Sequence, residues 1–297
     1  MTPKVLGPAT CLACACVCIS TARAQGERKA PVSDVEDARL STVRVGEGRL
    51  HPVLGVDVRN GDFVRGVYDD DAAGLRRVPL HVQVGLAVEL TRDAGGMPTS
   101  WLLARSSNGF HRPSDAERSG PRAWYESNNA IGAAARLGDG VDAAATYTVK
   151  TSPNDVSKTT HEMSVAVSMD RESGFGSLKP GFVATWRPKG GSGFYTQASL
   201  EPEWRVDVTG AESRLSLPVV VGVGWKGFYE PGSRQRVFGS AGLALETPLP
   251  LGDGRRWAIR LETVALVRDA QLRALGGPRA DHATVVPYAT LSLSYVE

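Results

Sequence analysis

Charged residues at alternate positions are the first features of this sequence that could support chemistry. Glu201, Glu203 and Arg205 alternate within one segment, and Arg260 and Glu262 alternate within another. Alternate residues of a β-strand point to the same side of the sheet, so each set is expected on one face. Two hypotheses fit such a face: candidates for lining the lumen of a barrel, or an internal salt-bridge network that closes it. If the lumen is open, the excess of carboxylates predicts a weak preference for cations.

A second set of residue types could support ester hydrolysis. His161, Glu162 and Ser164 lie within one short segment, and a serine nucleophile needs a histidine and an acid on its own side. His161 and Ser164 differ in parity, so a strand directs them to opposite faces. This strand alone therefore supplies no catalytic set, and we predict no catalytic residue. An outer-membrane lipid-modifying hydrolase, with partners from other strands, remains the alternative hypothesis.

Three further patterns match cofactor or metal motifs only in part. The run Gly222-Val223-Gly224-Trp225-Lys226-Gly227 has the letters of a dinucleotide fingerprint, but a loop-forming sequence follows where the fingerprint requires a helix. Cys11 and Cys14 have a metal-like spacing without a second pair. Asp69-Asp70-Asp71 could hold a divalent cation or form a solvated acidic loop. We therefore predict no cofactor and no metal.

The N-terminus has the pattern of a secretory signal. An apolar run follows Lys4, and Ala22-Arg23-Ala24 places small residues where signal peptidase cleaves. We expect residues 1–24 to be removed and the mature chain to begin at Gln25. All four cysteines fall within the leader, so the mature chain needs no thiol chemistry. A lipoprotein signal acylated at Cys14 or Cys16 is the alternative.

Charge and hydropathy narrow the class of the mature chain. Lys4 and Arg23 account for two of the 34 basic residues, which leaves 32 against 32 acidic residues. Nucleic acid is not an expected partner, because its binding proteins carry a basic excess. No run after the leader approaches the roughly 18 apolar residues of a membrane-spanning helix. If the chain crosses a membrane, it must therefore do so as strands.

Alternation of apolar and small or polar residues is the dominant pattern. From Leu215 to Trp225 every second residue is apolar, over a length that suits a tilted strand crossing a bilayer, roughly 9–11 residues. The pattern recurs in about twelve segments, an even number as bacterial barrels require. These segments span 54–58, 80–90, 101–108, 131–137, 141–149, 161–169, 178–186, 194–206, 215–225, 237–245, 257–267 and 285–295. We predict an all-β fold, a transmembrane antiparallel up-and-down β-barrel over residues 50–297, after a loose polar lead-in at 25–49.

The connections and aromatic residues add detail to this prediction. Gly138-Asp139-Gly140 indicates a tight hairpin, and Asn60-Gly61 indicates a bulge in the first strand. Alternate connections differ in average length, as expected of short periplasmic turns and long external loops. Val221 is expected to face lipid and Gly222 the interior. Aromatic residues near strand ends indicate an interfacial girdle: Trp101, Tyr125, Trp186, Trp204, Trp225, Trp257 and Tyr295.

The order of several short motifs resembles one known family. The motifs are Asp62-Phe63-Val64-Arg65-Gly66, His161-Glu162, Gly193-Phe194-Tyr195, and Leu217-Pro218 with Gly222. Together they resemble the TorF-like outer-membrane porin family over approximately residues 50–295. Two departures are that Phe63 stands where the family prefers tyrosine, and that Tyr295-Val296-Glu297 replaces a terminal aromatic residue. The resemblance implies a porin-like barrel.

These patterns lead to one functional hypothesis with alternatives. We expect an exported protein of the outer membrane of a Gram-negative bacterium, not an enzyme, which acts as a porin-like passive conduit for small solutes or as a closed structural barrel. Besides the hydrolase, an adhesion or interaction barrel is an alternative, with binding at residues 67–79 or 106–122. Expected partners are outer-membrane lipid, lipopolysaccharide and the barrel assembly machinery. The sequence does not identify the small-solute ligand.

Overall fold

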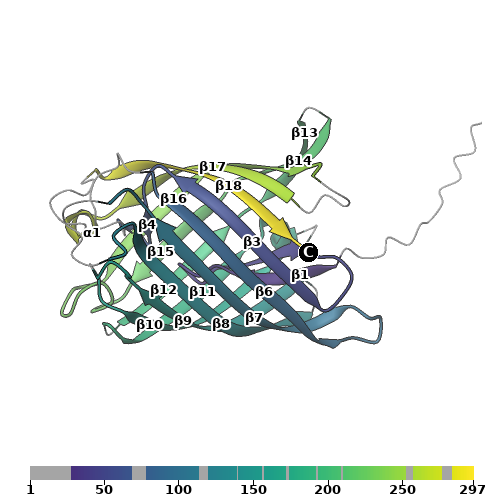
Figure 1. Ribbon diagram of the computed structural model, residues 1–297, viewed down its shortest axis with the longest axis horizontal. Coiled ribbons are helices and arrows are strands. Elements are labelled where there is room, and N and C mark those ends of the chain that lie inside the picture. The colour runs from purple at the N-terminus through teal and green to yellow at the C-terminus, as the bar shows by residue number, and fades with distance from the viewer. Residues whose placement is uncertain are drawn as a thin grey trace, which may run out of the picture.

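One antiparallel sheet closes on itself to form a barrel (Figure 1). The computed structural model describes residues 28–68, 78–113, 120–138, 140–155, 157–171, 174–191, 193–208, 210–251, 257–275 and 283–297. Most strands pair with their neighbours in the chain, β12 pairs with β15 and β14 with β16, and β18 returns to β3. The sheet consists of β3 (Leu50–Arg59), β6 (Leu80–Arg92), β7 (Pro98–Phe110), β8 (Trp124–Gly138), β9 (Val141–Thr151), β10 (Thr160–Met169), β11 (Gly181–Lys189), β12 (Gly193–Leu200), β13 (Glu203–Val208), β14 (Ala211–Ser216), β15 (Val219–Gly224), β16 (Arg236–Leu249), β17 (Trp257–Arg268) and β18 (Val285–Val296).

Two prolines divide what the alternation predicted as uninterrupted strands. The segment 194–206 is split at Pro202 into β12 and β13, and the segment 215–225 is split at Pro218 into β14 and β15. Proline has no backbone N–H and cannot donate to the ladder. The fourteen segments of the sheet therefore form a closed barrel of twelve strands, which confirms the predicted fold class. The hairpin of β13 and β14 projects at one end (Figure 1).

The two faces of the barrel have the polarity that the sequence predicts. In β6, Val84 is 51% exposed on the outside, whereas His81 and Ala87 are buried inside. The same holds in β10, where Val165 is 56% exposed and Ser164 is buried. Apolar side chains thus form the outer surface, as in a barrel that faces lipid. Among the described residues, no helix has both the length and the apolar character to span a membrane.

Connections of different length lie at opposite ends of the barrel. The end that holds the chain terminus and the β13–β14 hairpin has the tight turn between Gly138 and Val141. The other end has α1 (Ala270–Leu275) and a small hairpin of β4 (Phe63–Val64) and β5 (Val67–Tyr68). Short turns are periplasmic in bacterial barrels, so we name these the periplasmic and the outer end.

Two details of the sequence prediction were wrong. Asn60-Gly61 is not a bulge, because β3 ends at Arg59 and the Asn60 side chain binds the backbone of Pro287 and Ala289. Trp101 and Tyr125 do not belong to an outer aromatic girdle, since both are buried inside the barrel. Trp101 lies opposite Glu89 in the register and shares its inward side. Trp186, Trp204 and Trp225 do lie exposed on the outside.

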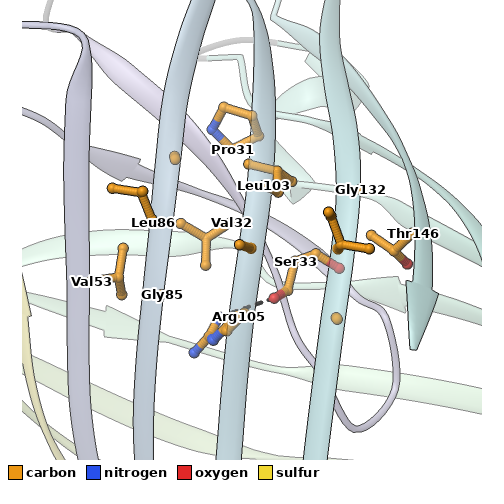
Figure 2. A pocket seen from close by; sticks show the side chains of 14 residues that line it. Pro31, Val32, Ser33, Val53, Gly85, Leu86, Leu103, Arg105, Gly132 and Thr146 are labelled. Atoms are coloured by element: carbon orange, nitrogen blue, oxygen red, sulfur yellow. Dashed lines mark hydrogen bonds between the residues drawn. The ribbon is translucent and has the colours of Figure 1, made fainter. Parts of the chain in front are cut away.

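The N-terminal segment differs most from the prediction of a loose lead-in. Its residues form a hairpin of β1 (Lys29–Ser33) and β2 (Leu40–Arg44), which we call the plug hairpin. Its apolar side chains, including Ala30 and Leu40, are buried against the inner wall. Figure 2 shows Val32 and Ser33 against β6, β7 and β8, where only about 20 Å³ stays unfilled.

Small side chains on the inner wall make room for the plug hairpin. Ala87, Ala134, Ala144 and Ala166 are buried and belong to the same apolar cluster as Ala30 and Leu40. A larger residue at these inward positions would occupy the volume of the hairpin, because protein interiors are close-packed. The predominance of small residues on the polar face of the predicted strands therefore had a structural cause that the sequence analysis did not recognise.

The exposed face allows a direct test of the lipid-facing side. Val221 is 50% exposed on the outside, whereas its neighbour Val220 lines an internal cavity. We expect Val221→Arg to cost roughly 2–4 kcal/mol near the membrane centre and Val220→Arg to cost less, because its charge reaches a polar interior. Urea titration of the protein in lipid vesicles, followed by heat-modifiable gel mobility, compares the two variants. Equal losses would contradict the assignment of the faces.

Gly222 is unsuitable as the tolerant control in this test. It faces inward, but a Cβ there would lie 2.3 Å from Cε1 of Phe238 and 2.5 Å from the Tyr195 hydroxyl. Any side chain at this position would clash with both rings, so Gly222→Ser is expected to destabilise the barrel as well. The position requires glycine because two aromatic rings approach its backbone.

Candidate functional site

A polar cavity of about 270 Å³ lies in the lumen, large enough for several water molecules. The turn of the plug hairpin supplies Asp34, Glu36 and Arg39 to its lining. The other lining residues belong to the β4–β5 turn and to inward positions of β3, β6, β12 and β15 to β18. Both acidic and basic side chains line the space, so it can hold polar or charged solutes and disfavours apolar ones.

Polar contacts tie the plug hairpin to the barrel. At its start, Lys29 Nζ donates to Asp170 Oδ2 at 2.6 Å on the periplasmic side. At its turn, the Arg105 guanidinium donates to the Ser33 carbonyl at 3.0 Å, a bond drawn in Figure 2. Lys150 donates to the backbone carbonyl of Glu36. None of these side-chain bonds belongs to the strand ladder of the barrel, because β1 and β2 form a separate sheet.

The Arg59 guanidinium is the centre of a buried charge group at the plug turn. It binds both carboxylate oxygens of Glu36 at 2.8 and 2.9 Å, Asp57 at 2.6 Å and Asp62 at 2.9 Å. Arg59 ends β3 and Asp62 follows it in the chain, whereas Glu36 belongs to the plug hairpin. The plug is thus held to the barrel wall by a charge-assisted pair that is shielded from water.

His81 extends this group to the opposite side. Its Nδ1 lies 3.4 Å from Asp57 Oδ2, and its Nε2 lies 3.4 Å from both Asp62 Oδ2 and Glu126 Oε2. The Tyr125 hydroxyl donates to Asp62 at 2.6 Å and lies 2.9 Å from His81 Nε2. All of these side chains are buried, so their interactions act in a medium of low dielectric constant.

Burial and neighbouring charges shift the two loop carboxylates in opposite directions. Burial of Asp62 would raise its pKa, but the charges of His81 and Arg59 and the Tyr125 hydroxyl hold that pKa well below its usual range. Burial of Glu36 raises its pKa to about 7, since Arg59 and His81 offset only part of the cost. The neighbouring cations therefore compensate the charge of the Glu36 carboxylate only in part.

A second buried charge group lies towards the outer end. Arg65 donates to both carboxylate oxygens of Glu162, at 2.7 and 2.9 Å, and Arg187 donates to the same carboxylate at 2.7 Å. The Arg65 guanidinium also lies over the Tyr195 ring, 4.7 Å from its centre, and Arg187 lies 4.3 Å from the centre of the Phe228 ring. The β4–β5 turn is thereby fixed inside the mouth of the barrel.

The motifs that carried the family resemblance meet at this second group. Arg65 comes from the first motif, Glu162 from the second and Tyr195 from the third. Arg65 adopts a positive φ of 52°, and Gly66 follows with a φ of 80° against the Phe238 side chain. Residues far apart in the sequence therefore serve one structural task, which is to hold the first outer loop in the lumen.

Of the five lumen-lining candidates predicted from the sequence, three lie close together. Arg260 Nη2 donates to Glu201 at 2.7 Å and to Glu262 at 2.7 Å, and Arg260 and Glu262 line the cavity. The other two, Glu203 and Arg205, lie elsewhere. Glu203 pairs with Lys179 at 2.6 Å, and Arg205 pairs with Glu212 on the projecting hairpin, where its side chain is 69% exposed. The interruption at Pro202 separates Arg205 from the barrel wall.

The sequence analysis missed the two buried groups because their members come from distant strands and loops. Asp57 and Arg59 alternate within β3, but Glu36, His81 and Glu126 each come from a different element. A signal did exist, since a lone charged residue at an inward position of a barrel strand needs a partner across the lumen. The sequence analysis named Asp62 and Arg65 only as part of the motif at residues 62–66 and predicted no partner for either charge.

The remaining sequence hypotheses have different outcomes. His161 and Ser164 lie on opposite faces as expected, since His161 contacts the exposed Tyr147 whereas Ser164 is buried beside Thr185 at 2.8 Å. The glycine-rich run that begins at Gly222 is followed by a turn and not by a helix. The leader and Asp69-Asp70-Asp71 lie outside the described residues, as do parts of both loops proposed for adhesion.

Comparison with known proteins finds similarity to solved structures alone. No protein-family model and no curated protein matches the chain. LpxR from Salmonella typhimurium is 9% identical, with 82% of this chain and 99% of that chain covered and a TM-score of 0.43. The NanC porin is 8% identical, with 82% and 98% covered and a TM-score of 0.46. The KdgM porin is 6% identical, with 82% and 98% covered and a TM-score of 0.39.

Proposed function

We propose that this protein is a porin-like outer-membrane barrel that acts as a passive conduit for small solutes, with the plug hairpin narrowing the path. The closed barrel with an apolar outer surface supports the location, because barrels of this kind belong to the bacterial outer membrane. Outer-membrane lipid, lipopolysaccharide and the assembly machinery are the partners that such a location requires. The convergence of Arg65, Glu162 and Tyr195 supports the finer assignment to the TorF-like porins.

The charged cavity beside the plug hairpin carries this proposal. A purely structural barrel needs only complementary side chains that fill its interior, as the alanine-rich wall does beneath the plug. Here the opposite wall instead keeps about 270 Å³ of space, lined by Arg39, Arg260 and Glu262 among others. Mixed charges around a narrow space favour small hydrophilic solutes.

Single-channel recording on the purified full-length protein in planar bilayers tests the proposal. We expect discrete, passive conductance steps that need no energy source. The hydrolase alternative predicts instead turnover of lipid esters that one serine substitution abolishes. A protein that inserts fully, as heat-modifiable mobility reports, but never conducts under any applied voltage would contradict the conduit and favour the closed barrel.

The ion selectivity of the path should depend on the carboxylates beside Arg260. We expect the pair Glu201→Gln with Glu262→Gln to shift the reversal potential in a salt gradient towards anions, because Arg260 and Arg39 then lose their neutralising partners. The matched control is Glu203→Gln with Glu212→Gln, which removes the same charge outside the cavity lining. An equal shift in both variants would mean that surface charge, and not this cavity, sets the selectivity.

A further inference from the structure

Three potential metal-ligating side chains converge at the contact between the plug and the barrel wall. Glu36 belongs to the plug turn, His81 to β6 and Glu126 to β8. One ligand atom from each lies within 4.8 Å of the others. His81 is 0% exposed and Glu126 is 6% exposed, so this is not the usual solvated cluster of acidic groups on a surface.

The barrel register explains how the two wall residues come together. Asp57 of β3 lies opposite His81, His81 lies opposite Gly109 of β7, and Gly109 lies opposite Glu126. These residues form one row around the inner wall. Glycine at the third place makes room for the Tyr125 ring, which would lie 2.7 Å from a Cβ there. Glu36 reaches the His81 and Glu126 side chains from the plug hairpin.

Buried acceptor atoms at this place have no donor. Among the residues that the structure describes, Glu126 Oε2 and Asn128 Oδ1 are both buried without a hydrogen-bond partner. The Asn128 amide instead donates to the other oxygen of Glu126 and so leaves Oε2 directed at His81, 3.4 Å from Nε2. Buried polar atoms are nearly always paired, so the orphaned Glu126 Oε2 beside the imidazole indicates a place that a cation can fill.

The charge balance of the group also favours a bound cation. Four carboxylates face one guanidinium and one imidazole: Glu36, Asp57, Asp62, Glu126, Arg59 and His81. Two further cations at its edge, Lys150 and Arg105, bind the backbone carbonyls of Glu36 and Ser33. If His81 is neutral, the carboxylates of the group outnumber these cations. Uncompensated buried charge is costly, and a divalent cation would offset the excess.

We propose that Glu36, His81 and Glu126 bind a divalent transition-metal ion, with zinc the best match, that links the plug hairpin to the barrel wall. Zinc accepts imidazole nitrogen and carboxylate oxygen together, whereas calcium and magnesium prefer oxygen alone. Neutral His81 would ligate through Nε2 in place of its contact with the Tyr125 hydroxyl at 2.9 Å, while Asp57 lies 3.4 Å from Nδ1. Arg59 orients the Glu36 carboxylate by binding both of its oxygens, and the Asn128 amide holds Glu126.

This metal site does not depend on the conduit function, because binding can be measured in a barrel that never conducts. It does have a consequence for the plug. One ligand comes from the hairpin and two come from the wall, so metal binding stabilises the plugged state over any state in which the hairpin has left. By linkage, removal of zinc should make the hairpin easier to displace.

Zinc binding to the untagged full-length protein in detergent micelles tests the proposal. After chelator treatment, isothermal titration with zinc should give one site per chain, with calcium and magnesium at least about tenfold weaker. Glu36→Gln and Glu126→Gln should each weaken zinc binding at least about tenfold. His51→Gln is the matched control, because His51 is equally buried and pairs with Glu89 at 2.9 Å outside the group.

Three results would overturn the site: no zinc binding to the stripped protein, equal affinity in all variants, or loss of binding only in the His51 variant. If Glu126→Gln does not fold, X-ray absorption of the zinc-loaded native chain decides. We expect one imidazole nitrogen and carboxylate oxygens at roughly 2.0–2.2 Å. A shell of water oxygens alone would mean adventitious metal, with His81 then protonated between Asp57 and Glu126.

Discussion

Removal of the plug hairpin, residues 28–45, is expected to raise the single-channel conductance at least about fivefold, because a barrel of this strand number has a lumen that side chains alone do not fill. The hairpin lies inside the barrel, and its apolar contacts include small wall residues such as Ala134 and Ala144. Once it is gone, these positions leave open space. The mixed-charge cavity then joins that space into one wider path.

The barrel should survive this deletion. Its strand ladder is complete without the hairpin, since β1 and β2 pair only with each other, and a closed ladder satisfies its own backbone groups in lipid. Arg59 loses Glu36 but keeps Asp57 and Asp62 as partners. We therefore expect the deletion variant to insert and to keep its heat-modifiable mobility.

A matched deletion separates plug loss from general damage. Residues 206–213 form the outer part of the β13–β14 hairpin, which projects at the periplasmic end beyond the residues of β14 that pair with β16, Arg214 to Ser216. Removing them takes away chain outside the lumen and leaves the pairing of β14 with β16 in place. It should leave the conductance close to that of the native protein. If both deletions raise the conductance equally, or if neither does, the plug hairpin does not restrict the path.

Much of the fold could be predicted because a barrel wall has a simple sequence signature. Each strand repeats with a period of two, so alternation located nearly all of the wall, and lipid contact made one parity consistently apolar. The two prolines at positions 202 and 218 were visible as well, but alternation continues across both of them. Only the sheet pairing shows that the segments beyond them form a projecting hairpin.

The plug hairpin could not be predicted by the same reasoning. Lys29–Ser33 and Leu40–Arg44 are short and bury both faces in part, since one side meets the wall and the other the polar lumen. Neither strand therefore shows a long alternation. The information lay in the wall, where alanine occupies inward positions such as Ala87 and Ala166, and small residues there mean that something else fills the volume.

The sequence could predict on which face of a strand a site residue lies, but not which residues from other strands it contacts. Parity grouped Arg260 with Glu262 on one face because both belong to one strand, and both residues line the cavity. It could not bring Glu36 to His81 or Arg65 to Glu162, since such pairs depend on the stagger between distant strands and on loops that enter the lumen. Single-strand patterns contain no information on that stagger.

Loss of Glu162 is expected to be the most destabilising single change in the outer half of the barrel. Its carboxylate is 1% exposed, binds Arg65 through both oxygens and also binds Arg187. Glu162→Gln would leave the buried guanidinium of Arg65 and the partly exposed one of Arg187 without their anion, and removing one partner of a buried ion pair costs about 3–5 kcal/mol. The exposed pair of Arg205 and Glu212 is the control, because Glu212→Gln should cost less than about 1 kcal/mol.

Urea titration of folding into lipid vesicles measures these free energies, and a double-mutant cycle shows whether the cost comes from the pair. Arg65→Met in the Glu162→Gln background should cost clearly less than Arg65→Met alone, since the carboxylate that the guanidinium neutralised is already gone. The β4–β5 turn should also become accessible to protease from the outer side in the Glu162→Gln variant, because Arg65 no longer holds it in the lumen. Additive costs, or a protected turn, would mean that the turn is held by the packing of Gly66 against Phe238 and not by the ion pair.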